Sequence, residues 1–238
     1  MKAAVRPLTD RQCAAAVRLL ASRDPRLAAV IAHAGRCRLT QSRTHHPFVS
    51  MVRALVSQQL SGKAADTIYG RVVALAGGPD AMAPARLVAI DPAELRAAGL
   101  SRQKISYLVD LSERVLAGRL DLASLEDRPD DEVIEAITAV KGFGRWSAEM
   151  FLMFRLNRPD VFPVTDLGIV KGMQRLLGMR GKPSVRTMLR AAEAWRPYRS
   201  VAAWYLWRVV EMPAKAKNEI IPARRVRQVR RVRQVRKG

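Results

Sequence analysis

The sequence predicts an all-α fold, and three of its features support this fold class. Apolar residues recur at intervals of three and four along most of the chain, as they do on the buried face of a helix. Capping residues, prolines and glycines stand at the ends of these segments. No stretch has a convincing strand pattern or phosphate-binding glycine loop, which disfavours nucleotide-cofactor chemistry.

The composition predicts a well-buried core and a polyanionic partner. The chain has 238 residues, with 42 Lys and Arg against 21 Asp and Glu, and so a net charge of +21. An excess of this size favours nucleic acid ahead of an anionic membrane surface. The two cysteines, Cys13 and Cys37, are too few to hold a four-cysteine iron–sulfur cluster or a zinc ion alone.

The sequence also favours a cytoplasmic protein with reduced cysteines, although the two cysteines could pair. Residues 1–10 lack the apolar core of a signal peptide. No apolar run approaches the roughly 18 residues that a membrane helix needs, so we expect no membrane partner. Disulfides are rare in the cytoplasm.

The N-terminal segment, residues 10–34, is predicted to form two helices. Asp10 can cap the first helix, and Asp24 followed by proline is typical of the start of a second. The polar stretch that follows contains His45 and His46 without further ligands at metal-binding spacing, so we interpret them as surface histidines.

The next part of the chain is predicted to contain several helices. Residues 48–60 form an amphipathic segment, and Ser61 can cap a further helix that ends near Ala76. Gln58 and Gln59 interrupt the apolar pattern between them, which is typical of a solvated helix end. After a break at 77–79, the pattern predicts helices at 92–98, 101–117 and 121–126.

The stretch that follows predicts two helices joined by a glycine hairpin. Asp130 can cap the first helix, and the second is predicted over 145–156. Between them, Gly142 and Gly144 flank one apolar residue, which permits a tight turn. The free N–H groups of Gly142, Gly144 and Arg145 would then bind a phosphate oxygen without reading base sequence.

The C-terminal part is predicted to contain three more helices and a basic tail. Asp166 precedes a helix at 167–177, and Asp is a common N-cap. Helices at 184–195 and from 196 to Glu211 follow. The tail, 214–238, is rich in arginine and predicted to be disordered; it could add salt-dependent DNA affinity or only solubility.

Three segments carry a resemblance to a known family. VKGFGRWSAEMF, SQQLSGKAA and RPYRSVAAWYLWR resemble the DNA-3-methyladenine glycosylase II (AlkA-like) branch of the helix-hairpin-helix DNA glycosylases. The resemblance implies an all-α fold of two helical lobes with a DNA-binding cleft between them. The chain differs from some relatives in that we expect no iron–sulfur cluster, because it has only two cysteines, and no β-rich N-terminal domain before the core. The resemblance also implies these parts: N-terminal helices at 1–45 packed on the C-terminal lobe, a central lobe at 46–162, the C-terminal lobe at 163–213 and the tail at 214–238.

The resemblance also implies which residues form the active site. Asp166 matches the carboxylate that stabilises the positively charged sugar and orients water. Trp146 stands where the strand-nicking branch has a Schiff-base lysine, which implies base removal without lyase activity. Trp146, Met150 and Trp207 match the base pocket, where an indole face can attract a positively charged N-alkylated purine.

The resemblance further implies how DNA is held. Gln59, with Gln58 and Leu60 beside it, matches the loop that fills the gap left by an extruded base. The hairpin residues expected to contact DNA are Lys141, Gly142, Phe143, Gly144 and Arg145. A monovalent cation, Na⁺ or K⁺, would be bound by the backbone carbonyls of Thr138, Val140 and Phe143.

The function implied is monofunctional hydrolysis of the N-glycosidic bond of alkylated bases in duplex DNA. No cofactor is required, and we expect a monomer associated with the nucleoid in the cytoplasm. Two alternatives stay open at this stage: a non-catalytic helix-hairpin-helix DNA-binding protein and a bifunctional glycosylase/lyase. The sequence does not rank 3-methyladenine, 7-methylguanine, 1-methyladenine, ethenoadenine and hypoxanthine as substrates.

Overall fold

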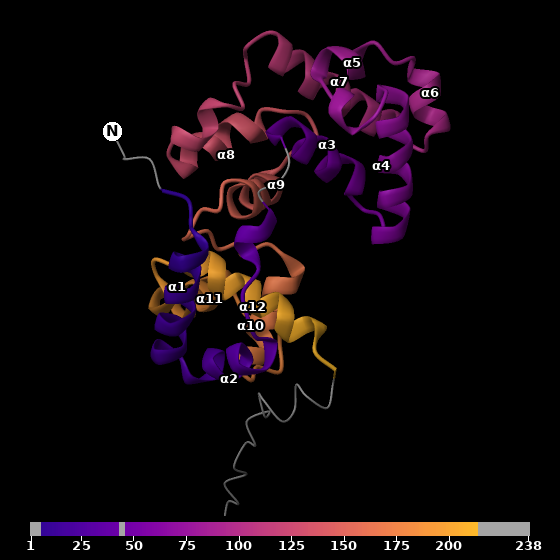
Figure 1. Cartoon of the computed structure of the whole chain (residues 1–238). Helices are drawn as coiled ribbons and strands as arrows, with labels where there is room; N and C mark the ends of the chain where they lie inside the picture. Colours follow the sequence, from indigo (N-terminus) through magenta and orange to yellow (C-terminus); the bar gives the residue numbers. More distant parts are fainter. Residues whose placement is uncertain (1–5, 43–45, 214–238) are drawn as a thin grey trace, which may run out of the picture.

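A computed structural model describes residues 6–42 and 46–213, and within these ranges every regular element is helical. Figure 1 shows the helices gathered into two lobes, which agrees with the predicted fold class. The predicted tail, 214–238, lies outside the described residues. Within the described ranges, none of the helices has both the length and the apolar character needed to span a bilayer.

The lower lobe in Figure 1 combines helices from both ends of the chain. Its core includes Leu20, Leu27, Met173, Trp195 and Tyr205, each nearly or fully buried. Its elements are α1 (Asp10–Arg23), α2 (Pro25–Ala34), α10 (Leu167–Leu176), α11 (Val185–Ala192), the 3-10 turn η5 (Glu193–Trp195) and α12 (Arg199–Glu211).

The upper lobe contains the middle of the chain. One of its helices, α5, was not predicted, because it is only five residues long and its capping position is an alanine. Its elements are α3 (Pro47–Ser57), α4 (Gly62–Ala76), η2 (Pro79–Ala81), α5 (Pro84–Val88), α6 (Pro92–Ala97), α7 (Arg102–Leu116), η3 (Ser124–Asp127), α8 (Asp130–Thr138) and α9 (Arg145–Met150).

Two predicted helix caps are wrong, and in both cases the aspartate is the first residue of the helix. Thr9 caps α1 by accepting a hydrogen bond from the N–H of Gln12, and Asp10 instead pairs with Arg36. Pro129 occupies the cap position of α8, while Asp130 pairs with the fully buried Arg158. A first-turn carboxylate still favours a helix through the dipole, so both segments remain helical.

Other predicted caps occupy the expected positions. Asp24 caps α2 and accepts hydrogen bonds from two backbone N–H groups. Ser101 and Ser184 cap α7 and α11. Ser61 stands at the N-cap of α4, but its hydroxyl makes no capping bond with any described residue.

Two helical segments differ from their predicted extents. The helix predicted over 145–156 is α-helical only to Met150 and continues as one π-helical stretch, η4 (Phe151–Arg155). Such wider turns are frequent at functional sites. The α-helix predicted over 121–126 is absent, and the 3-10 turn η3 (Ser124–Asp127) overlaps its second half.

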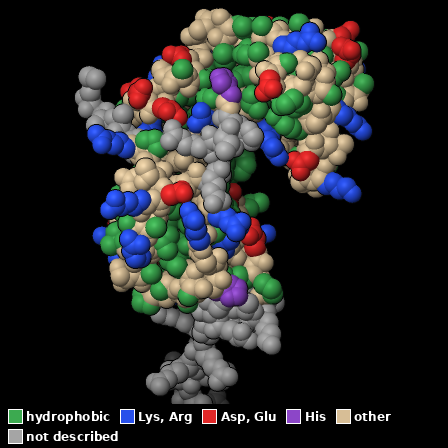
Figure 2. Space-filling model, viewed as in Figure 1, with side chains coloured by type: hydrophobic (Ala, Val, Ile, Leu, Met, Phe, Trp, Pro, Cys, Tyr) green, Lys and Arg blue, Asp and Glu red, His purple; other side chains and the backbone are tan. Residues whose placement is uncertain are grey.

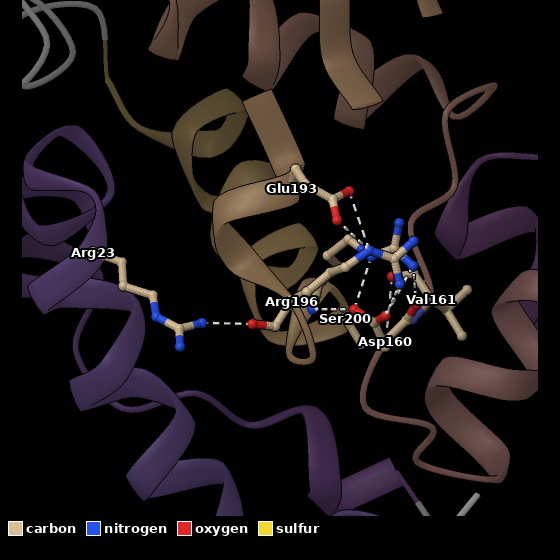
Figure 3. Close-up of polar contacts among 7 residues, drawn as sticks. Arg23, Asp160, Val161, Glu193, Arg196 and Ser200 are labelled. Atoms are coloured by element: carbon tan, nitrogen blue, oxygen red, sulfur yellow. Dashed lines mark hydrogen bonds and ion pairs between the residues drawn. The ribbon is translucent and has the colours of Figure 1, made fainter. Parts of the chain in front are cut away.

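The chain crosses from the upper to the lower lobe through a segment that contains Asp160 and Val161. This segment is hydrogen-bonded to α12 and to the turn before it. Figure 3 shows Asp160, Arg196 and Ser200 close together, with Arg23 reaching the carbonyl of Arg196. Arg199 donates to both carboxylate oxygens of Asp160, at 2.7 and 2.9 Å. The Ser200 hydroxyl accepts from the N–H of Val161 at 2.8 Å. These bonds fix the crossing segment six residues before Asp166.

Figure 2 shows that one face of the molecule is hollowed between the two lobes. Lys and Arg side chains lie on both lobes beside this hollow. The arrangement suits a polyanion that contacts both lobes at once.

Candidate active site

Asp166 stands at the start of α10 and accepts three hydrogen bonds. Its Oδ1 accepts from the N–H of Ile169 at 2.8 Å and from Nε1 of Trp207 at 2.9 Å. Its Oδ2 accepts from Nε1 of Trp146 at 2.8 Å. The residue therefore caps its helix, and at the same time two indoles from different elements orient its half-buried carboxylate.

Two glycines allow this close arrangement. A Cβ on Gly168 would lie 2.5 Å from Cδ1 of Trp207 and 3.0 Å from Oδ1 of Asp166. A Cβ on Gly172 would lie 2.6 Å from the backbone oxygen of Leu206. α10 can therefore approach α12 closely only because these positions lack side chains. The sequence reasoning missed both, although two glycines four residues apart in a helix were a visible signal.

The predicted pocket residues do not all line the same cavity. A cavity of about 650 Å³ lies among α3, the hairpin, α9 and η4. Trp146 and Met150 line it, together with the unpredicted Phe154. Trp207 and Asp166 are outside its lining, but Phe154 stacks on Trp207 with ring centroids 5.6 Å apart.

Trp146 joins the cavity to the carboxylate. Its side chain is 44% exposed, its ring lines the cavity, and its N–H donates to Asp166. An apolar, partly aromatic cavity beside an oriented carboxylate is what a flipped, positively charged base would require.

The hairpin adopts the tight turn that its glycines predict. Gly142 has φ +81°, and a Cβ there would lie 2.1 Å from the ring of Tyr107. Gly144 is the N-cap of α9, and glycine has no side chain with which to cap the first-turn N–H groups. Those N–H groups, including that of Arg145, belong to an exposed turn and can donate hydrogen bonds to an anion.

The remaining hairpin residues are held by neighbouring elements. The N–H of Lys141 donates to Oδ2 of Asp110 at 2.9 Å. Phe143 is buried, and its N–H donates to the carbonyl of Val140 at 3.1 Å. Arg145 pairs with Glu149 at 3.0 Å.

Glu149 is a buried acid that the sequence reasoning missed. Its side chain is 4% exposed, and Oε2 has no hydrogen-bond partner among the described residues. Burial raises the pKa of Glu149; Arg145 opposes this increase, and the negative charge of Asp166 adds to it. The carboxylate of Asp166 therefore has a second acid in its electrostatic surroundings.

The loop between α3 and α4 places its glutamines differently. Gln58 is half-buried, and its amide donates to the carbonyl of Gly142 at 3.0 Å. Gln59 is exposed with φ +58°, and Leu60 is 38% exposed. Gln58 thus connects the loop to the hairpin, while Gln59 and Leu60 face solvent.

The predicted cation ligands are backbone carbonyls, and the structure leaves that site a prediction. The carbonyl of Val140 accepts the hydrogen bond from Phe143, and the hydroxyl of Thr138 donates to the carbonyl of Ile134 at 2.8 Å. Across residues 6–42 and 46–213, no group of three or more His, Cys, Asp or Glu side chains could hold a metal.

Comparison with known proteins identifies the family. Residues 52–197 match the model described as HhH-GPD superfamily base excision DNA repair protein. The chain belongs to this superfamily. This HhH-GPD protein is 35% identical over 167 residues to DNA-3-methyladenine glycosylase 1 of Schizosaccharomyces pombe, a match that covers 70% of this chain and 73% of the relative.

Solved structures give the same result. A DNA-3-methyladenine glycosidase from Bacillus halodurans has a TM-score of 0.73 and 41% identity, over 82% of this HhH-GPD chain and 88% of that one. The S. pombe 3-methyladenine DNA glycosylase Mag1, solved in complex with abasic DNA, has a TM-score of 0.74 and 32% identity. The match covers 83% of this chain and 97% of that one.

Proposed function

We propose that this HhH-GPD protein hydrolyses the N-glycosidic bond of alkylated bases in duplex DNA, as the first step of base excision repair. It is a hydrolase of the DNA-3-methyladenine glycosylase type. The observation that supports this function most directly is the Asp166 carboxylate held by the indoles of Trp146 and Trp207 beside an apolar cavity.

The chemistry assigned to Asp166 is electrostatic. Cleaving the base from deoxyribose develops positive charge on the sugar, which a fixed carboxylate stabilises without reorganisation. The same group can orient the water that attacks the opened face of the sugar. An N-alkylated purine is already a cationic leaving group, so protonation of the base is not needed. Position 146 carries an indole and no amine, so we infer no Schiff base and no strand cleavage.

The pocket and the DNA contacts follow from the same geometry. The flipped base would stack against Trp146, with Met150 one helical turn further and Trp207 behind the carboxylate. The hairpin N–H groups of Gly142, Gly144 and Arg145 would bind a phosphate. Gln59 would enter the gap in the duplex and hydrogen-bond the orphaned base.

Several finer assignments are also proposals. Hydrolysis by one carboxylate needs no cofactor, and a monovalent cation at the carbonyls of Thr138, Val140 and Phe143 would only connect the hairpin to phosphate. We infer a monomer that acts on chromosomal DNA in the cytoplasm. The domain limits 1–45, 46–162 and 163–213 stay predictions.

The test is base release from duplexes that carry 3-methyladenine, 7-methylguanine, 1-methyladenine, ethenoadenine or hypoxanthine, with free base and strand breaks measured separately. Asp166→Asn keeps an oxygen that can cap α10 but removes the charge. We expect free base without strand breaks from the wild type, and a loss of about 100-fold or more in the variant with DNA affinity retained.

The matched control is Asp91→Asn, because Asp91 is an exposed aspartate N-cap of α6. This variant should release base at the wild-type rate. Tight DNA binding without base release from any of the five lesions would instead indicate a non-catalytic DNA-binding protein. Strand breaks together with a borohydride-trapped adduct would indicate a lyase.

A further inference from the structure

One side of α7 contacts both of the loops assigned to DNA. Lys104, Tyr107 and Asp110 follow one another at intervals of three, so they lie on successive turns of the same side. Lys104 contacts the loop after α3, while Tyr107 and Asp110 contact the hairpin. None of the three had a role in the predicted site.

Lys104 binds the end of α3. Its Nζ donates to the carbonyls of Val56 and Gln58, each at 2.7 Å. These carbonyls stand at the C-terminus of the helix, where the helix itself supplies no donor and the dipole attracts a cation. The next residue, Gln59, is left-handed and exposed, so the lysine fixes the backbone from which Gln59 projects.

Lys104 is only half-buried, and its ammonium is removed from bulk water by the carbonyls that it binds. Burial lowers the pKa of Lys104. A lysine that only solvated the surface of α7 would not be held between two carbonyls of another helix.

The hairpin is attached to the same helix. The Tyr107 ring lies against Gly142, and Asp110 accepts from the N–H of Lys141 while Arg114 holds its carboxylate at 2.8 Å. The amide of Gln58 then bonds the carbonyl of Gly142 directly. The loop and the hairpin are therefore fixed relative to each other, both through α7 and by this direct hydrogen bond.

We propose that Lys104 is a positioning residue for base flipping, which holds the carbonyls of Val56 and Gln58 so that Gln59 enters the duplex at a fixed offset from the phosphate bound by the hairpin. This inference rests on the proposed function. Binding of one phosphate then determines where the inserted side chain meets the base stack. The entropy cost of ordering the loop falls on folding of the protein and not on base flipping.

The test is Lys104→Met, which keeps the length of the side chain and removes the donor. The substrate is the lesion that the wild type excises fastest among the five above, placed either opposite its normal partner or opposite a mismatched base. We expect single-turnover release from the paired lesion to fall about tenfold. Release from the mismatched lesion, which unstacks without help, should fall less than about twofold.

Two controls separate positioning from a general loss of charge or of folding. Lys182→Met removes one exposed lysine in the lower lobe and should change neither rate. Lys104→Arg retains donors and should restore most of the paired-lesion rate. Affinity of Lys104→Met for undamaged duplex should stay within about twofold of wild type, because the hairpin N–H groups are untouched.

The outcomes are distinguishable. An equal loss on paired and mismatched lesions, or no loss on either, would overturn the positioning role while leaving the glycosylase activity in place. Absence of base release from the wild type would instead contradict the proposed function itself. Should Lys104→Met unfold, Lys104→Gln removes the charge and shortens the side chain while keeping a polar group, and it too must reduce release from the paired lesion more than from the mismatched one.

Discussion

In the proposed function, the hairpin in the upper lobe and the Asp166 site in the lower lobe offer DNA different kinds of group. The hairpin presents backbone N–H donors, and its neighbours Tyr107 and Asp110 serve to shape and hold that backbone. The Asp166 site presents a side chain, and Trp146 and Trp207 hold it by their N–H groups. DNA binding by the hairpin should therefore be sensitive to distortion of the backbone. Base release at the Asp166 site should be sensitive to changes of side-chain chemistry.

The comparison also shows that both regions depend on absent side chains. Gly142 allows Tyr107 to approach the hairpin, and Gly168 allows Trp207 to approach Asp166. An added methyl group at each position should therefore separate the two functions, with binding reduced in one case and chemistry in the other.

The largest effect is expected from Gly168→Ala. Its Cβ would occupy space within 2.5 Å of the Trp207 ring, so the indole must leave Asp166 or α10 must move away from α12. Single-turnover base release should fall about 100-fold, since small displacements of catalytic groups have effects of this size. Affinity for undamaged duplex should be unchanged.

The matched control is Gly70→Ala, at an exposed helical position where a Cβ would meet nothing within 4 Å. This change should leave release intact and raise stability by about 0.5–1 kcal/mol. If Gly168→Ala releases base at the wild-type rate, the contact between Trp207 and Asp166 does not contribute to catalysis.

Gly142→Ala is expected to have the next largest effect, and on binding. Its Cβ meets the Tyr107 ring, and alanine is strained at φ +81°. Affinity for undamaged duplex, measured by fluorescence anisotropy, should fall about tenfold as the phosphate donors are displaced. In Gly144→Ala, where a Cβ would meet nothing within 4 Å, this affinity should fall much less. Equal losses from both would indicate that the turn geometry is unimportant.

Trp207→Phe should have a smaller effect on chemistry. Phenylalanine keeps a ring for the stack with Phe154 but removes the N–H that Asp166 accepts. The loss of one hydrogen bond to a carboxylate predicts about a tenfold decrease in base release. The affinity of the protein for the free base should change little. A variant as active as the wild type would mean that Trp146 and the N–H of Ile169 are enough to orient Asp166.

Asp110→Asn should have the smallest effect, on stability. Burial raises the pKa of Asp110, but the N–H of Lys141 and the guanidinium of Arg114 lower it, and the net pKa lies below its usual value. The folded pKa is thus below the unfolded value of about 3.9, so the carboxylate stabilises the fold above that pH and loses this contribution as pH falls through the folded pKa.

We therefore expect Asp110→Asn to lower the free energy of unfolding by about 1 kcal/mol at pH 7, with the difference shrinking below about pH 4. Urea unfolding at both pH values measures this difference. Asp66→Asn is the control, because Asp66 pairs with Arg53 while 68% exposed, and it should cost about 0.5 kcal/mol or less. A difference for Asp110→Asn that does not depend on pH would exclude its charge as the cause.

The sequence predicted helix positions and the placement of the hairpin well, because apolar periodicity and glycine punctuation are local signals. Asp166 on its own could only be predicted as a helix cap, and its functional assignment came from the three family-like segments together. The structure places its carboxylate against the indoles of Trp146 and Trp207, which lie 20 residues before and 41 residues after it. Local patterns do not predict pairs so distant.

What the sequence missed depended on tertiary contacts. Lys104 in a predicted helix resembles any solvated lysine until α3 brings two carbonyls to it. Phe154 looks like an ordinary core residue, and the π-helical turn that carries it has no local sequence signal. The prediction of Asp10 as a cap was wrong because Thr9, directly before it, is also a good capping residue and occupies that position.

The double role that we propose for Asp166, as helix cap and catalytic carboxylate, has a genetic consequence. Asparagine caps helices about as well as aspartate, so a chain with asparagine at this position should fold, bind DNA and pass any test of expression or solubility. One G-to-A transition in the codon is enough to make that change. We expect such a protein to bind lesions without removing them and so to compete with active repair enzymes for the same sites.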